Sequence, residues 1–147
     1  MLFRSGDVLD VTVTHEDGSE EGVGRVCNLT SNITLKECCE MVKKSFSLDA
    51  VRVFGDLEKE VHRLAICPGA GKSDIETALI KGADVYVTGD IGHHDGIDAV
   101  AKGMAIIDAG HYGVEHIFIE DMKRYLETHL EGVEVIAAPV NHPFATV

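Results

Sequence analysis

Residues 83–115 decide the fold, and they read ADVYVTGDIGHHDGIDAVAKGMAIIDAGHYGVE. A short apolar run at 83–89 is followed by a helical pattern at 93–103 and then by a second apolar run at 104–110. A strand, a helix and a strand in this order are typical of a β-α-β unit, whose strands lie parallel in one sheet. The stretch therefore predicts an α/β fold.

The same alternation continues on both sides of this stretch. Apolar runs recur at 62–67 and 133–139, and helical patterns recur at 73–82 and 111–130. We therefore expect a three-layer α/β sandwich in which helices cover a mostly parallel sheet. Its four strands are expected at 62–67, 83–89, 104–109 and 133–138, within a C-terminal β-α-β domain at 61–147 that carries the candidate metal ligands.

The N-terminal region, residues 1–60, has a different pattern. Alternating residues at 8–15 and 22–29 flank a turn signal, which predicts a β-hairpin. A helix is expected to follow over 34–46, where Thr34 and Glu37 have the spacing of a capping box. We interpret this region as a hairpin plus a helix, with a short strand at 50–54.

Composition excludes several classes of protein. The chain has 147 residues, 45% of them hydrophobic, and a net charge of -12. The apolar content argues against disorder. No apolar run approaches the roughly 20 residues of a membrane span. The excess of acidic residues argues against binding to nucleic acid or to an anionic membrane surface. The start shows no secretory signal, and the four cysteines form no C-x-x-C pair, so we expect reduced thiols and a cytoplasmic location.

Three loops should meet at one edge of the sheet, because ligands bind beyond the carboxyl ends of parallel strands. They span residues 67–73, 88–95 and 108–115. The first resembles a phosphate-binding loop, but Ile66 stands where a Walker A motif requires glycine. It is either a tight turn with Ser73 as the helix N-cap or a place where backbone amides hold a small anionic or nucleotide ligand.

The third loop carries the sharpest chemical pattern. His111 and Glu115 are four residues apart, so both lie on one helix face and could bind a divalent metal ion. A solvated helix surface produces the same pattern, and both interpretations stay open. In the second loop, His94 or Asp90 could support the metal or donate a proton, whereas Asp90 and Asp95 could instead cap a helix.

A family resemblance covers about residues 22–146. Residues 88–127, TGDIGHHDGIDAVAKGMAIIDAGHYGVEHIFIEDMKRYLE, resemble the C-terminal signature of the NGG-one-interacting-factor-three-like family. The upstream pieces GVGRVCNL, VRVFGD and LAICPGAGKS resemble the same family in the same order. Its bacterial members are often labelled type two GTP cyclohydrolase homologs or dinuclear metal-centre proteins.

The resemblance implies an α/β protein with two bridged metal ions, assembled as a toroidal hexamer. The metal ligands of its GHYxTE motif fall on His111 and Glu115, with Val114 in place of threonine, and the histidine of its TGDxxxHDA stretch falls on His94. The family's other ligands come from an N-terminal half with a His-His-Pro stretch and a later Asp, which residues 1–21 do not contain. The chain is therefore expected to be the C-terminal part of a member, whether a truncated product, a fragment or a stand-alone domain.

Two functions are expected on this basis. The first is a divalent-metal-binding protein, with zinc, manganese, iron and magnesium not distinguished, that acts as a metal-dependent hydrolase in which His94 moves protons. The alternative is a non-catalytic assembly or protein-interaction module. In either case we expect a homo-oligomer, with residues 1–60 contributing much of the contact.

Overall fold

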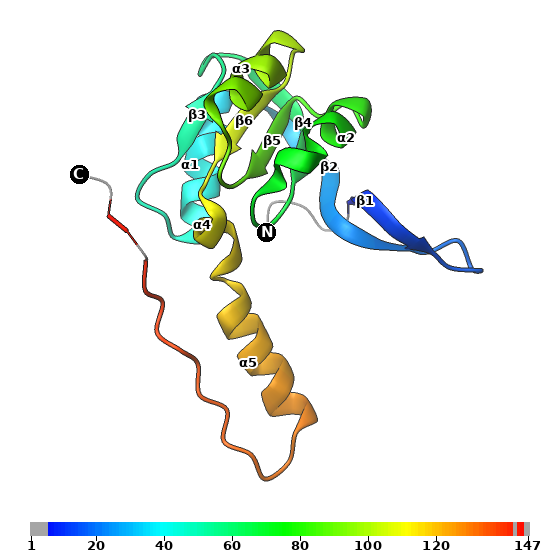
Figure 1. Ribbon diagram of the computed structural model, residues 1–147, viewed down its shortest axis with the longest axis vertical. Helices are drawn as coiled ribbons and strands as arrows, with labels where there is room; N and C mark the ends of the chain where they lie inside the picture. The colour runs from blue at the N-terminus through cyan, green and yellow to red at the C-terminus, as the bar shows by residue number, and fades with distance from the viewer. Residues whose placement is uncertain (1–5, 143, 146–147) are drawn as a thin grey trace.

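A computed structural model describes residues 6–142 and 144–145 of the chain. Residues 1–5, 143 and 146–147, which fall in the two predicted regions 1–60 and 61–147, lie outside the described residues. Six strands form one sheet in the order β1-β2-β4-β5-β6-β3 (Figure 1). Their bounds are β1 Asp7–Thr14, β2 Glu20–Thr34, β3 Arg52–Phe54, β4 Glu60–Ile66, β5 Val85–Thr88 and β6 Ala105–Asp108.

The sheet is mixed, which corrects the expectation of a mostly parallel one. The pairs β4–β5 and β5–β6 are parallel, as the β-α-β pattern predicts. The pairs β1–β2, β2–β4 and β3–β6 are antiparallel. The N-terminal hairpin is confirmed, and its long second strand joins it to the edge of the parallel trio.

Helices cover both faces of the sheet, so the three-layer arrangement is confirmed. α1 (Leu35–Phe46) packs on one face, and its first turn has the predicted capping box between Thr34 and Glu37. α2 (Ile75–Ile80) and α3 (His93–Ala101) pack on the opposite face. Fully buried residues such as Leu35 and Ile106 each contribute about 1.5–3 kcal/mol of transfer free energy.

Two segments predicted as single helices are each made of two pieces. The segment expected at 73–82 begins as a 3-10 helix, Gly71–Asp74, and continues as α2. The segment expected at 111–130 is divided into α4 (His111–Glu115) and α5 (Phe118–His129), with turn residues 116 and 117 between them. α5 has no buried residue and extends away from the sheet (Figure 1).

The strand predicted at 133–138 is wrong, because these residues form no regular structure. The β-α-β pattern would place this strand beside β6, but β3 takes that position and pairs Val53 with Ile107. Residues 131–142 instead return along the protruding α5 (Figure 1).

Candidate metal centre

The three loops that follow β4, β5 and β6 are in direct contact, as the sequence predicts. The Gly89 amide donates a hydrogen bond to the Gly69 carbonyl at 2.9 Å, which joins the first loop to the second. A Cβ on Gly89 would lie 2.4 Å from the Gly110 carbonyl carbon and the His111 nitrogen, so the second loop touches the third. Glycine is required here because a side chain would collide with backbone.

Asp108 joins the second loop to the third. It is the last residue of β6 and is only 6% exposed. Its Oδ1 accepts from the amides of Asp90 and Gly110, each at 3.0 Å, and its Oδ2 accepts from the Ile91 amide at 3.0 Å. The guanidinium of Arg52, its register partner on β3, lies 2.5 Å from Oδ2. One carboxylate therefore fixes the backbone on both sides of the candidate site.

His111 and Glu115 share one face of α4, as their spacing predicts. Nε2 of His111 lies 3.3 Å from Oε2 of Glu115, and both side chains are about half exposed. Nδ1 of the same imidazole lies 3.4 Å from Oδ2 of Asp90. A Cβ on Gly69 would be 2.9 Å from Oε1 of Glu115, so the first loop closes one side of this pair.

The ligand atoms of His111 and Glu115 are of types that suit a divalent metal ion, but there are only two such side chains in this pair. Imidazole nitrogen and carboxylate oxygen are ordinary ligands for zinc, manganese and iron. Within residues 6–142 and 144–145, no group of three or more His, Cys, Asp or Glu side chains has an arrangement that could hold a metal ion. His111 and Glu115 thus fit as two ligands of an incomplete coordination sphere.

His94 occupies the first turn of α3 and is exposed. Its ring centroid lies 5.3 Å from that of His93, and the described contacts of this imidazole include none with His111 or Glu115.

The alternative interpretation of the second loop, in which Asp90 and Asp95 cap a helix, is wrong. The N-cap of α3 is Gly92, without a side-chain hydrogen bond, whereas Asp95 pairs with Lys72 at 3.1 Å.

The glycine-rich first loop is held by side chains of β5. The Gly71 amide donates to the Thr88 hydroxyl at 2.9 Å, and the Tyr86 hydroxyl donates to the Gly71 carbonyl at 2.9 Å. Burial raises the pKa of Tyr86, so its hydroxyl stays a donor. Ser73 is not an N-cap, since its hydroxyl donates to Asp74 instead. The Gly71 amide is therefore already satisfied within the protein.

Sequence reasoning missed the roles of Asp108, Thr88 and Tyr86. All three are polar side chains within otherwise apolar strands, and each is buried. A buried polar side chain needs a hydrogen-bond partner, so a polar residue inside an apolar run signals that a loop is held there. That signal is present in the sequence at Thr88 and Asp108, the last residues of β5 and β6.

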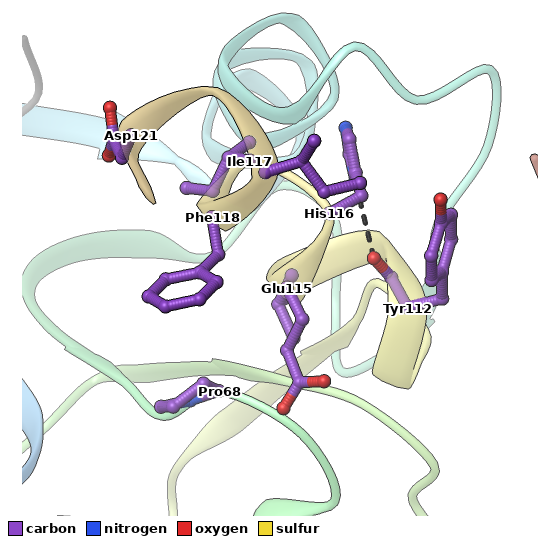
Figure 2. Close-up of a pocket in the computed structure, with 9 residues that line it drawn as sticks. Pro68, Tyr112, Glu115, His116, Ile117, Phe118 and Asp121 are labelled. Carbon is purple, nitrogen blue, oxygen red and sulfur yellow. Dashed lines mark hydrogen bonds between the residues drawn. The ribbon is translucent and has the colours of Figure 1, made fainter. Parts of the chain in front are cut away.

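A cavity of about 590 Å³ lies beside Glu115 (Figure 2). Its wall is mainly apolar, and the Glu115 carboxylate points toward the loop that carries Pro68. The other lining residues are Tyr112, Val114, His116, Ile117, Phe118, Ile119 and Asp121. Glu115 therefore borders an open space that a small molecule or another protein segment could enter.

Comparison with known proteins gives a consistent result. The sequence profile of the Duf34/NIF3 (NGG1p interacting factor 3) family matches residues 4–143. The GTP cyclohydrolase 1 type 2 homolog of Streptococcus pneumoniae is 41% identical over 121 residues, which cover 80% of this chain and 45% of that protein. NIF3-like protein 1 of Bos taurus is 34% identical over 115 residues, covering 76% of this chain and 30% of that protein.

Solved structures agree with the sequence comparison. The crystal structure of a Bacillus cereus protein related to NIF3 superposes with a TM-score of 0.77 at 32% identity, covering 88% of this chain and 37% of that one. A Staphylococcus aureus protein superposes with a TM-score of 0.77 at 31% identity, covering 86% and 42% of the two chains. The chain thus spans less than half the length of these relatives.

Proposed function

This chain belongs to the Duf34/NIF3 family, and from that premise we propose that it contributes His111 and Glu115 to a site for divalent metal ions. The observation that supports the proposal most strongly is the 3.3 Å approach of Nε2 to Oε2 on one face of α4. Both atoms lie at the carboxyl ends of the parallel strands, where α/β proteins bind ligands. Gly69 brings the first loop against this pair without a side chain of its own, since a Cβ there would lie 2.9 Å from Oε1 of Glu115 and 3.3 Å from Nε2 of His111.

The proposed site is incomplete within the described part of the chain. Tight protein sites recruit three or four protein ligands, whereas His111 and Glu115 supply two. The remaining positions would be filled by water, by another chain, or by a region of the family fold that this chain does not span. We therefore expect weak binding, with a dissociation constant above about 1 μM.

The proposed chemistry is hydrolysis. A bound divalent ion polarises a substrate and lowers the pKa of bound water. The relatives that carry the name GTP cyclohydrolase 1 type 2 homolog point to the same reaction class. His94, exposed on the first turn of α3, is the proposed proton carrier, and His111 and Glu115 would hold the metal.

A second candidate function, an assembly module, is favoured by apolar side chains that the chain leaves exposed. Phe118 and Tyr125 on α5 are 60% and 56% exposed, and Val13 on the hairpin is 45% exposed. Exposed apolar patches commonly mark interfaces, and symmetric homo-oligomers are the usual way to cover them. We propose that the chain assembles with copies of itself, which is compatible with the metal site.

The proposed metal site is tested by calorimetric titration of Zn²⁺ or Mn²⁺ into the full chain. Wild type should bind with a dissociation constant above about 1 μM, and His111→Ala and Glu115→Gln should abolish the heat signal. The matched control is His129→Ala, which removes an exposed imidazole from α5 and should leave binding unchanged. Binding that survives both ligand substitutions would overturn the proposal, as would the absence of binding at millimolar metal.

A further inference from the structure

We propose that Asp90 is a positioning residue for His111. Its carboxylate holds the proton of the imidazole on Nδ1 and so leaves the lone pair of Nε2 for a metal ion beside Glu115. The proposal rests on the proposed metal site and adds to it a residue that binds no metal itself.

The geometry places one carboxylate at each nitrogen of the His111 ring. Oδ2 of Asp90 lies 3.4 Å from Nδ1, and Oε2 of Glu115 lies 3.3 Å from Nε2. The other oxygen of Asp90, Oδ1, accepts the backbone amide of His111 at 3.4 Å. The Asp90 carboxylate therefore contacts both the backbone and the ring of the same residue.

The backbone of Asp90 is held in an unusual conformation that makes this contact possible. Its φ is 56°, in the left-handed region that residues other than glycine seldom adopt. The conformation is fixed on both sides, because Asp108 accepts the amides of Asp90 and Ile91 at 3.0 Å. Strain of this kind persists only where the surrounding structure over-determines it, and it concentrates at functional sites.

The chemistry of a ligating histidine requires such a partner. A neutral imidazole has one protonated nitrogen and one lone pair, and the hydrogen bond made by one nitrogen decides which of them can ligate. A carboxylate at Nδ1 stabilises the Nδ1–H tautomer and makes Nε2 the ligand. Removing such a carboxylate typically lowers metal affinity by 10–100-fold.

Asp90→Gly is the most informative variant. Glycine adopts a φ of 56° without cost, so the substitution removes the carboxylate while the loop keeps its backbone conformation. Asp90→Asn keeps an oxygen that can accept from Nδ1–H but removes the charge. Asp98→Asn is the control, because it removes one negative charge from an exposed position on α3.

The first measurement is the ¹⁵N chemical shift of both ring nitrogens of His111, recorded on the metal-free full chain at about pH 8.5, where histidine is ordinarily neutral. It is made in Glu115→Ala, because in the metal-free wild type the Glu115 carboxylate at Nε2 competes with that of Asp90 at Nδ1. Glu115→Ala should show the Nδ1–H tautomer, and the further substitution Asp90→Gly should shift the ring toward Nε2–H. The second measurement is zinc affinity, which should fall about 10–100-fold in Asp90→Gly, less in Asp90→Asn, and not in Asp98→Asn.

The outcomes separate this proposal from the metal site on which it rests. Zinc binding that depends on His111 and Glu115 but not on Asp90 would overturn the positioning role and leave the metal site intact. An Nε2–H tautomer in Glu115→Ala, where no Glu115 carboxylate faces Nε2, would also overturn it, whatever the zinc affinity of wild type. No zinc binding by wild type would overturn the metal site, and the positioning role with it. Unchanged thermal unfolding of Asp90→Gly shows that a loss of affinity is not a loss of fold.

Discussion

Replacing Asp108 by asparagine should destabilise the protein through the loops of the candidate site. Each carboxylate oxygen of Asp108 accepts two donors: Oδ1 accepts Asp90 and Gly110, and Oδ2 accepts Ile91 and Arg52. An asparagine presents an NH₂ group in place of one oxygen, so two donors must face another donor in either orientation. The orientation that loses Arg52 is favoured, because that guanidinium is 58% exposed and can turn to water.

The cost can be estimated from the bonds that are lost. The buried Ile91 amide is left without an acceptor, which costs about 1–3 kcal/mol, and loss of the charged partner adds about 1 kcal/mol. The total is about 2–4 kcal/mol. At roughly 3 °C per kcal/mol for a chain of this size, the unfolding midpoint should fall by about 6–12 °C.

Differential scanning calorimetry of Asp108→Asn and Arg52→Ala measures this directly. Arg52→Ala should lower the midpoint less than Asp108→Asn, because the three amide donors to Asp108 remain and the Arg52 side chain itself is 58% exposed. An Asp108→Asn midpoint within 2 °C of wild type, or a larger loss in Arg52→Ala, would refute the reasoning. Either result would mean that Asp108 does not hold the two loops together.

Three further predictions follow from the packing. Gly89→Ala should lower the free energy of unfolding in urea by about 1–3 kcal/mol, because the new Cβ would lie 2.4 Å from backbone atoms of Gly110 and His111. An unchanged urea midpoint would contradict the contact between the second and third loops. Burial raises the pKa of Cys38 from 9.0 to about 12. Between these two pH values the unfolded chain holds fewer protons than the folded chain, because its thiol is ionised while the buried thiol is not. The free energy of unfolding should therefore fall as the pH rises above 9, by up to about 1.4 kcal/mol per pH unit. Cys38→Ala should flatten that fall, and an equal slope in both proteins would exclude this thiol as a cause. Light scattering should give a mass above the 15.9 kDa of one chain, and Val13→Asp should reduce it. A wild-type mass equal to that of the monomer would refute the oligomer.

The sequence predicts the parallel trio of strands well, because its signals are local. Apolar runs that alternate with helical patterns place β4, β5 and β6 in order, and a parallel arrangement of such units brings their following loops together. The capping box of Thr34 and Glu37 is equally local, since both partners lie within one helical turn. The spacing of His111 and Glu115 was sufficient to place both on one helix face.

The remaining features depend on contacts between distant residues. Periodicity shows which face of a strand is buried, but it does not show which strand lies beside it. The antiparallel pairing of β3 with β6 therefore could not be predicted, and β3 takes the position beside β6 at which the strand 133–138 is expected. Except for its bond to Gly110, the Asp108 carboxylate binds residues that are 17 to 56 positions away in the sequence, so no sequence spacing reveals these bonds.

The described residues include no helix that is both long enough and apolar enough to span a membrane.

All four cysteines are free and buried in the structure, although Cys38 and Cys39 are adjacent in the chain. Desolvation raises the pKa of each thiol, which makes them poor nucleophiles and poor metal ligands at neutral pH. These thiols are therefore poorer candidates for the metal site than the imidazole and carboxylate of α4.

X-ray absorption at the zinc edge, recorded on the zinc-loaded full chain, tests most directly whether His111 and Glu115 bind the metal. The zinc ion should have one imidazole nitrogen at about 2.0–2.1 Å and one carboxylate oxygen at about 2.0–2.2 Å, with water in the other positions. The imidazole contribution should disappear in His111→Ala, and the spectrum of Glu115→Gln should differ from that of wild type. A spectrum that neither substitution changes, or one dominated by sulfur at about 2.3 Å, would contradict the proposed site.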